Sequence, residues 1–343
     1  MQMPNKPVIL YVWKATAASP DGDLPAVFRS AVEAVGELVV RSAADLSHSE
    51  LCAAIRSSDV YLICRHSAMV PVEIAEDAGS LRLIVSAVGS LQPYVPRSVV
   101  ASRVPVCNWG DAPAEEIASG TLTLLLATLA DLHHHIVMRR RGIWKIDGEH
   151  HGGSLFGERV GLFGFGLIGR RFCELLAPFR CEVHVYDPYA VDLPSDVTKS
   201  ESLDDLFTRC RIISIHAGLT DETRHSVTAR HLALLADDAV IINTARGGII
   251  DQDALFHELQ SGRLRAGLDV LDDPDQVPVG HPSREWDNLI LTGHQVSLGW
   301  PRHGRAPSEL SKAQRYAVEN ITAVLRREPL KWLITLTQFD RMT

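Results

Sequence analysis

Residues 159–169 read Arg-Val-Gly-Leu-Phe-Gly-Phe-Gly-Leu-Ile-Gly. A short apolar run ends in a Gly-x-Gly-x-x-Gly pattern, which is formed by Gly164, Gly166 and Gly169, and a segment of helical period follows. This order is typical of a strand, a tight turn and a helix whose N-terminus can hold a phosphate group. The stretch therefore predicts the phosphate-binding turn of a doubly wound parallel sheet.

The next apolar run, residues 182–187, ends in Asp187, twenty-one residues beyond Gly166. A carboxylate at this position accepts hydrogen bonds from the ribose hydroxyls of a dinucleotide and repels a 2′-phosphate. Pro188 and Tyr189 follow, so no cation stands beside the carboxylate in the sequence. The pattern predicts a dinucleotide site that prefers NAD to NADP.

Apolar runs alternate with segments of helical period in two successive series. The second series begins after a long apolar helix that we expect over residues 114–141. Most runs are continuous rather than alternating, which indicates sheets covered on both faces. We predict an α/β protein with two Rossmann-like or flavodoxin-like doubly wound parallel-sheet domains and a cleft between them.

The domain boundaries follow from the two series. We expect an NAD-binding domain over residues 106–298 and a substrate domain over residues 1–105 and 299–343. The last segment belongs to the substrate domain because one final helix, near residues 308–327, is too little for a third domain and is expected to pack back on the first.

Composition excludes several classes of function. The net charge of -8 and the pI near 6.0 give no reason to bind nucleic acid or an anionic membrane. The longest apolar run, residues 122–130, is too short to span a bilayer. The 6 cysteines include no Cys-x-x-Cys pair and are expected to be reduced thiols. We expect a cytoplasmic protein.

Two histidine runs, residues 133–135 and residues 150–151, raise the question of a metal site. Consecutive helical residues point about 100° apart, so neighbours in one run cannot converge on one ion. We expect no metal site.

Arg246 and His294 each follow a predicted strand, at the edge of the sheet where α/β proteins bind their ligands. A guanidinium can hold a carboxylate with two parallel hydrogen bonds and polarise an adjacent carbonyl. An imidazole can supply the proton that a carbonyl oxygen needs after hydride transfer. These two side chains predict the reduction of a 2-oxo acid.

Taken together, these residues resemble the D-isomer-specific 2-hydroxyacid dehydrogenases. The resemblance covers most of the chain. Its motifs occur in the family's order at residues 161–170, 185–188, 216–220, 222–224, 243–247, 267–270 and 291–294.

The resemblance implies hydride transfer between NAD and C2 of a small D-2-hydroxy or 2-oxo acid, with Arg246 on the substrate and His294 as acid and base. It also implies a homodimer paired through the helix expected over residues 114–141. The cofactor contacts that we expect are Gly164, Gly166, Leu167, Ile168, Gly169, Asp187, His216, Thr244, Ala245, Arg246 and Asp269. The expected substrate contacts are Arg65, His66, Gly89 and Arg246.

The acid expected to orient His294 departs from the family pattern, which has a Glu before a Pro. Counting back from residues 280–282 selects Asp275 as the third catalytic residue, whereas counting on from Asp269 leaves Asp273 almost as good. Other readings also stay open. Relatives of the family act as NAD-sensing corepressors, and a dehydrogenase of formate or phosphite would share the cofactor domain.

Overall fold

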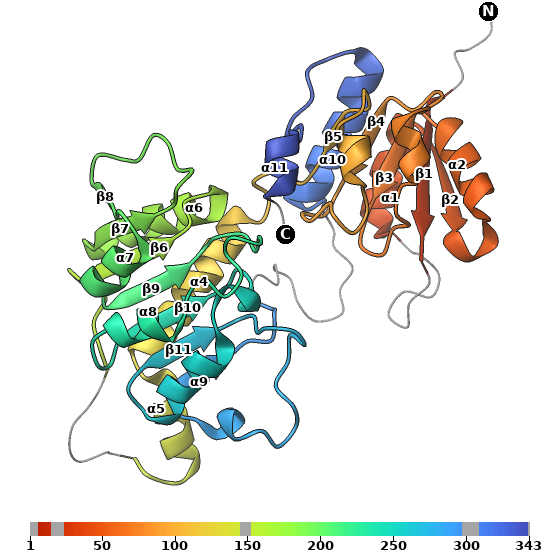
Figure 1. Ribbon diagram of the computed structural model, residues 1–343. Helices are drawn as coiled ribbons and strands as arrows, with labels where there is room; N and C mark the ends of the chain where they lie inside the picture. The colour runs from red at the N-terminus through yellow and green to blue at the C-terminus, as the bar shows by residue number, and fades with distance from the viewer. Residues whose placement is uncertain (1–5, 15–23, 145–151, 297–308, 342–343) are drawn as a thin grey trace, which may run out of the picture. The chain divides into compact units, whose positions relative to one another are not determined.

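The computed structural model describes residues 6–14, 24–144, 152–296 and 309–341. It divides into two compact units (Figure 1). Unit 1 comprises Met1–Pro113 and Trp300–Thr343, and unit 2 comprises Ala114–Gly299. Each unit has its own parallel sheet and its own core.

Unit 1 contains a five-stranded parallel sheet in the order β2-β1-β3-β4-β5. Its strands are β1 (Val8–Trp13), β2 (Glu37–Ser42), β3 (Val60–Ile63), β4 (Leu83–Ser86) and β5 (Val106–Cys107). Its helical elements are α1 (Ala26–Val35), η1 (Ala43–Asp45), α2 (His48–Arg56), η2 (Val72–Ala75), α3 (Arg97–Val100), α10 (Lys312–Arg326) and α11 (Leu336–Asp340). This strand order is the flavodoxin-like one.

Strand β3 shows why the sheet of unit 1 is covered on both faces. Val60 and Leu62 pack in the core that includes residues of α1 and α10, whereas Tyr61 and Ile63 pack in the core on the other face. All four side chains are fully buried. Alternate residues of a strand point to opposite faces, so a continuous apolar run fits a sheet between two helical layers.

Unit 2 contains a seven-stranded parallel sheet in the order β12-β11-β10-β9-β6-β7-β8. Its strands are β6 (Arg159–Phe163), β7 (Glu182–Tyr186), β8 (Val197–Lys199), β9 (Ile212–Ile215), β10 (Val240–Asn243), β11 (Arg265–Leu268) and β12 (Leu289–Leu291). Its helical elements are α4 (Ala114–Leu129), α5 (Leu132–Arg140), α6 (Leu167–Leu176), η3 (Ala177–Phe179), α7 (Leu203–Arg209), α8 (Ala229–Leu234), η4 (Gly247–Ile249), α9 (Gln252–Gln260) and η5 (Pro282–Glu285).

The order of strands in unit 2 reverses at β6. The chain runs outward from β6 through β7 to β8 and then returns to the other side of β6 with β9. Open α/β sheets bind their ligands beside such a reversal, at the carboxyl ends of the strands. The prediction of two doubly wound parallel-sheet domains is therefore confirmed.

The units divide eight residues later than the sequence boundary at 105 and 106. Strand β5 pairs with β4, and the amide of Ile84 donates a hydrogen bond to the carbonyl oxygen of Pro105 at 3.0 Å. Strand β5 has only two residues, so no apolar run marked it in the sequence.

The single helix expected over residues 114–141 is wrong. The structure has α4 and α5, which meet at an angle of 60°, and Asp131 between them adopts a left-handed backbone with φ of 54°. Donors from elsewhere bind the last carbonyl oxygens of α4. Gly153 donates its N–H to Leu129 at 2.7 Å, and the Arg265 guanidinium donates to Leu129 at 3.1 Å. These donors let α4 end there.

None of the described helices is, by itself, long and apolar enough to cross a membrane, although the bent pair α4 and α5 meets that test by length and composition. Helix α4 packs against β10, β11 and α6. Its buried side chains, which include Leu124, Leu125 and Leu129, belong to the core of unit 2.

Candidate active site

The glycine-rich turn lies between β6 and α6. Gly164 has φ of 98°, and a Cβ atom there would lie 2.5 Å from the backbone nitrogen of Ala217. A Cβ atom on Gly169 would lie 2.6 Å from the carbonyl oxygen of Gly164. Only glycine fits at either position, so the turn and the helix can pack closely against the loop that follows β9.

The first turn of α6 is open toward a ligand. The helix begins after Gly166, where no side chain caps it, and a Cβ atom on Gly166 would meet nothing within 4 Å. Leu167 is 50% exposed, and Ile168 is half-buried. A helix N-terminus has backbone N–H groups without intrahelical partners, which makes it a binding site for phosphate oxygens. The turn fits a pyrophosphate.

Asp187 follows β7 and is tied to the same turn. Its Oδ2 atom accepts a hydrogen bond from the Phe165 amide at 2.7 Å, and its Oδ1 atom accepts one from the Tyr189 amide at 2.8 Å. A carboxylate has about four acceptor positions, so these two bonds orient the group and leave capacity for ribose hydroxyls. Sequence analysis identified the residue but not its bond to the glycine-rich turn.

His216 follows β9, beside the glycine-rich turn. Its Nε2 atom lies 2.9 Å from the Ser214 hydroxyl oxygen, and its ring packs on Phe172 with centroids 5.0 Å apart. Burial lowers the pKa of His216 to about 3. The ring is therefore neutral near pH 7 and can exchange hydrogen bonds with a ligand but cannot supply a charge.

The loop after β10 carries Arg246 on a braced turn. The Asn243 side chain accepts a hydrogen bond from the Ala245 amide at 3.0 Å and donates one to the Arg246 carbonyl oxygen at 2.9 Å. The Thr244 hydroxyl lies 2.8 Å from the Thr121 hydroxyl of α4. Sequence analysis missed the role of Asn243, which the Asx-turn propensity of asparagine could have indicated.

The Arg246 guanidinium is partly buried, and it donates from Nη1 to the Ala245 carbonyl oxygen at 2.7 Å. Burial lowers the pKa of Arg246, and the charge of Asp275 acts in the opposite direction. A guanidinium keeps its proton in proteins, so the group is charged near pH 7. Unit 2 therefore has a cation close enough to interact with the Asp275 carboxylate.

Asp269 follows β11 and organises the segment that carries His294. Its Oδ1 atom accepts hydrogen bonds from the Thr292 hydroxyl at 2.6 Å, the Gln295 amide at 2.8 Å and the Val296 amide at 3.0 Å. Its backbone oxygen accepts a bond from the His294 amide at 2.5 Å. Sequence analysis assigned Asp269 to the cofactor and missed this bracing role, which depends on a loop 23 to 27 residues away.

His294 has a left-handed backbone with φ of 59°, which is uncommon for a residue other than glycine. Its side chain is 55% exposed, and its Nδ1 atom lies 2.7 Å from Oδ2 of Asp275. The other carboxylate oxygen of Asp275 accepts a bond from the Leu271 amide at 2.6 Å. The structure thus brings Asp275 and His294 together.

Asp273 has a different neighbourhood from Asp275. Its amide donates a hydrogen bond to Oδ1 of Asp272 at 2.9 Å, and Asp272 in turn bonds the His225 ring at 2.7 Å. The loop that carries Asp275 also packs against the loop that carries Arg246, because a Cβ atom on Gly247 would overlap the Leu271 carbonyl group. Arg246, Asp275 and His294 therefore lie on three adjoining loops of unit 2.

The remaining candidates lie in unit 1, at the carboxyl ends of its strands. Arg65 is exposed after β3, and His66 has a left-handed backbone with φ of 69°. Gly89 follows β4, where a Cβ atom would overlap the Trp109 indole ring. The Asn108 side chain donates to the Gly89 carbonyl oxygen at 3.3 Å. These residues share the edge of one sheet, the usual place for ligand-binding loops.

Comparisons with known proteins identify the family. Residues 122–295 match the description "D-isomer specific 2-hydroxyacid dehydrogenase, NAD binding domain". The chain is 32% identical over 306 residues to D-3-phosphoglycerate dehydrogenase of Methanocaldococcus jannaschii, covering 87% of this chain and 55% of that protein. It is 32% identical over 253 residues to hydroxypyruvate reductase of Thermotoga maritima, covering 73% of this chain and 81% of that protein.

A solved structure has the same fold. The TT0316 protein from Thermus thermophilus superimposes with a TM-score of 0.72 at 26% identity, covering 96% of this chain and 100% of that one. The chain spans about half the length of the phosphoglycerate dehydrogenase that it matches. Its unit 2 contains an NAD-binding domain with the glycine-rich turn, Asp187 and the strand reversal in place, so its cofactor is a nicotinamide dinucleotide. The chain belongs to the D-isomer specific 2-hydroxyacid dehydrogenase family.

Proposed function

We propose that the protein is an NAD-dependent oxidoreductase that interconverts a small 2-oxo acid and the corresponding D-2-hydroxy acid. The observation that carries the proposal is the 2.7 Å contact between Nδ1 of His294 and Oδ2 of Asp275. This pair lies in the unit that contains the dinucleotide turn and the Arg246 guanidinium. A proton donor, a cation and a hydride carrier together are what the reduction of a 2-oxo acid requires.

Each residue has a distinct role in this proposal. The bound nicotinamide supplies or accepts the hydride. With Nδ1 directed to Asp275, the Nε2 atom of His294 is the position that exchanges a proton with the substrate oxygen. Asp275 orients the ring and stabilises its charged form. Arg246 binds the substrate carboxylate and polarises the carbonyl group.

The cofactor preference is also a proposal. We infer that NAD is used rather than NADP, because the Asp187 carboxylate is held at the end of β7 by two backbone amides. A 2′-phosphate next to it would be repelled. We expect kcat/KM with NADH to exceed that with NADPH at least about tenfold, since one close like charge contributes about 1.4 kcal/mol or more. Equal values for both cofactors would contradict the inference.

A substrate panel tests the activity. NADH oxidation should be measured with glyoxylate, hydroxypyruvate and pyruvate, and NAD reduction with D-3-phosphoglycerate. Arg246→Lys keeps the charge but cannot form the planar two-point contact, so we expect a loss of at least about tenfold in kcat/KM for the preferred acid. Arg159→Lys, on an exposed salt bridge with Glu182 in the same unit, is the matched control and should be unaffected. NADH binding without turnover of any acid would instead favour an NAD-sensing interaction protein.

The finer assignments of location, assembly and substrate contacts belong to the same proposal. We propose a cytoplasmic homodimer that pairs through α4 and α5. The dimer surface is supported by Leu132 and Ile136 of α5, whose apolar side chains are exposed. The location is supported by the six cysteines, which form no disulfide bond. Sedimentation velocity should show a dimer that Ile136→Glu dissociates.

Arg65→Ala should raise the KM for the acid without changing the KM for NADH, if Arg65, His66 and Gly89 bind substrate.

A further inference from the structure

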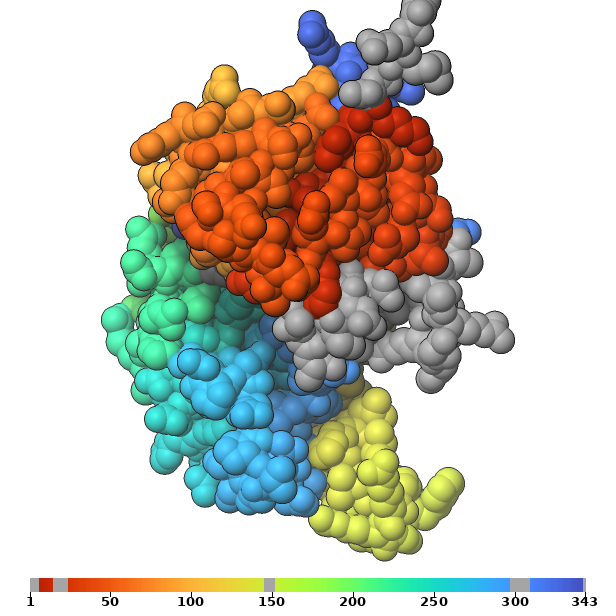
Figure 2. All heavy atoms as spheres, turned by 90° about the vertical axis from the view of Figure 1, so that its right-hand side faces the viewer, coloured from red at the N-terminus to blue at the C-terminus, as the bar shows by residue number. Residues whose placement is uncertain are grey.

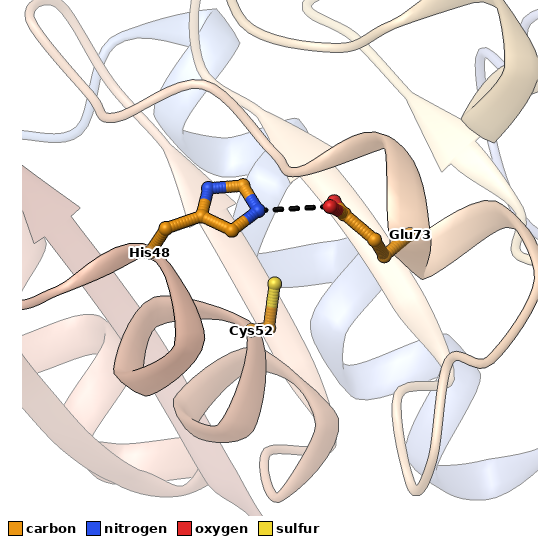
Figure 3. Close-up of side chains that lie close together, drawn as sticks. All are labelled: His48, Cys52 and Glu73. Atoms are coloured by element: carbon orange, nitrogen blue, oxygen red, sulfur yellow. Dashed lines mark hydrogen bonds and ion pairs between the residues drawn. The ribbon is translucent and has the colours of Figure 1, made fainter.

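A group of three potential metal ligands lies in unit 1, outside the residues discussed so far. His48 and Cys52 come from α2, and Glu73 comes from η2. One donor atom of each side chain lies within 4.8 Å of the others. Figure 3 shows the imidazole, the thiol and the carboxylate directed toward one another. It is the one such group found among the described residues.

The local sequence explains why these side chains meet. Residues four apart in a helix share a face, so His48 and Cys52 point the same way from α2. Ser47 and Glu50 form a capping box that fixes the first turn of α2, where His48 lies. Helix α2 contacts η2, and Glu73 lies in η2. Helix α2 lies at the right of unit 1 in Figure 1, on the face turned to the viewer in Figure 2.

The contacts within the group are incomplete. His48 Nε2 lies 2.9 Å from Oε1 of Glu73. The other oxygen, Oε2, is buried although the side chain is half-exposed, and it has no hydrogen-bond partner among the described residues. Cys52 is only 5% exposed. A buried carboxylate oxygen without a hydrogen-bond partner is unfavourable, so a surface ion pair alone leaves this oxygen unexplained.

We propose that His48 Nε2, Cys52 Sγ and a carboxylate oxygen of Glu73 bind one Zn²⁺ ion, with water as the fourth ligand. Nitrogen, thiolate sulfur and carboxylate oxygen are the ligands that zinc takes in tetrahedral sites. Coordination replaces the contact between His48 and Glu73, and the thiol proton of Cys52 passes to solvent. The ion links α2 to η2.

The geometry requires only a small adjustment. Bonds of about 2.0–2.3 Å from a tetrahedral ion place its ligand atoms about 3.3–3.7 Å apart. The donor atoms lie within 4.8 Å of one another, so the widest pair must approach by at most about 1.5 Å, while His48 Nε2 and Glu73 Oε1, now 2.9 Å apart, must separate slightly. Rotation of the exposed His48 and half-exposed Glu73 side chains can supply that movement while Cys52 stays in place. Sequence analysis considered only the two histidine runs for a metal site, and the separation of 25 residues between His48 and Glu73 leaves no local pattern that would indicate this group.

Cobalt provides a direct probe of the ligands. The full chain, freed of metal with a chelator, should be titrated with Co²⁺ and then with Zn²⁺. We expect one ion per chain, a thiolate-to-cobalt charge-transfer band, visible bands of tetrahedral intensity, and displacement of Co²⁺ by Zn²⁺ with a Kd on the order of micromolar or tighter.

Variants assign the signal to this group. Cys52→Ala should abolish the charge-transfer band, and His48→Gln and Glu73→Gln should each weaken Zn²⁺ binding at least about tenfold. The last two change partly exposed side chains, so they test the proposal even if Cys52→Ala folds poorly. Cys181→Ala and His257→Gln are matched controls in unit 2 and should bind as the unaltered chain does. Absence of the charge-transfer band, or equal loss in the controls, would show an ion pair beside a buried thiol and overturn the proposal.

Discussion

At the scale of single residues, Asp275 and Asp273 carry similar carboxylates two positions apart, and substitutions can distinguish their roles. Asp275→Asn removes the charge that faces Nδ1 of His294 at 2.7 Å, so the ring is less well oriented and its charged form is less stable. We expect kcat for acid reduction to fall roughly 10-fold to 100-fold while NADH affinity is unchanged. Asp273→Asn is the control and should retain kcat. The opposite ranking in steady-state assays would assign the supporting role to Asp273.

His216 makes a prediction about stability against pH. Its pKa is about 3 in the folded chain and about 6.5 when unfolded, so below pH 6.5 the unfolded state binds more protons. The stabilisation is complete above pH 6.5 and is lost progressively as the pH falls toward 3. Between pH 7.5 and pH 5, His216 should account for a loss of at most about 2 kcal/mol. Urea unfolding at both values measures it.

His216→Asn should lose less stability over that pH interval than the unaltered chain, whatever its stability at pH 7.5. His257→Asn, an exposed residue of α9, should show the same loss as the unaltered chain. The lowered pKa values of His184 and His231 are common to all three proteins, and burial is the first cause of each. An equal loss in His216→Asn would show that His216 titrates alike in both states.

At the scale of elements, the turn between β6 and α6 can be tested by comparing two glycines of positive φ. Gly164→Ala places a Cβ atom 2.5 Å from a backbone nitrogen, whereas Gly157→Ala places one in open space. Gly157→Ala should lower the free energy of unfolding by only about 1–2 kcal/mol, because alanine is strained in a left-handed backbone. Gly164→Ala should lower the free energy of unfolding by at least about 1 kcal/mol more than Gly157→Ala does. Its NADH affinity should fall at least about tenfold because the turn moves. Denaturation and fluorescence titration measure the two effects.

The elements that the sequence predicts are those with local signals. Strand β6, the turn and helix α6 were predicted because three glycines and an apolar run occur within eleven residues. Strand β8 was missed because it is a three-residue edge strand with mostly exposed side chains. The break at Asp131 was missed because one of its causes, Arg265, lies 136 residues from Leu129. Long-range donors of this kind leave no trace in a local pattern.

At the scale of the whole molecule, the two parallel-sheet α/β domains and the family agree with the sequence prediction. The candidate site was predictable in part, because Arg246 and His294 each follow a strand of one parallel sheet and such strands end at a common edge. Counting back from residues 280–282 selected Asp275, which the structure brings to His294. Asp273 stayed open because the path of the loop over residues 271–275 decides which acid meets the ring. The bracing by Asp269 depends on side-chain geometry in the same way.

The central claim is that the chain moves a hydride between NAD and C2 of a small acid, with His294 exchanging the proton. The most direct measurement is mass spectrometry of the product formed from a 2-oxo acid and NADH carrying deuterium at the transferable C4 position. We predict a D-2-hydroxy acid with the deuterium at C2. We also predict that His294→Gln binds NADH normally but turns over roughly 10²-fold to 10⁴-fold more slowly. Product without deuterium, or full turnover by His294→Gln, would contradict the account.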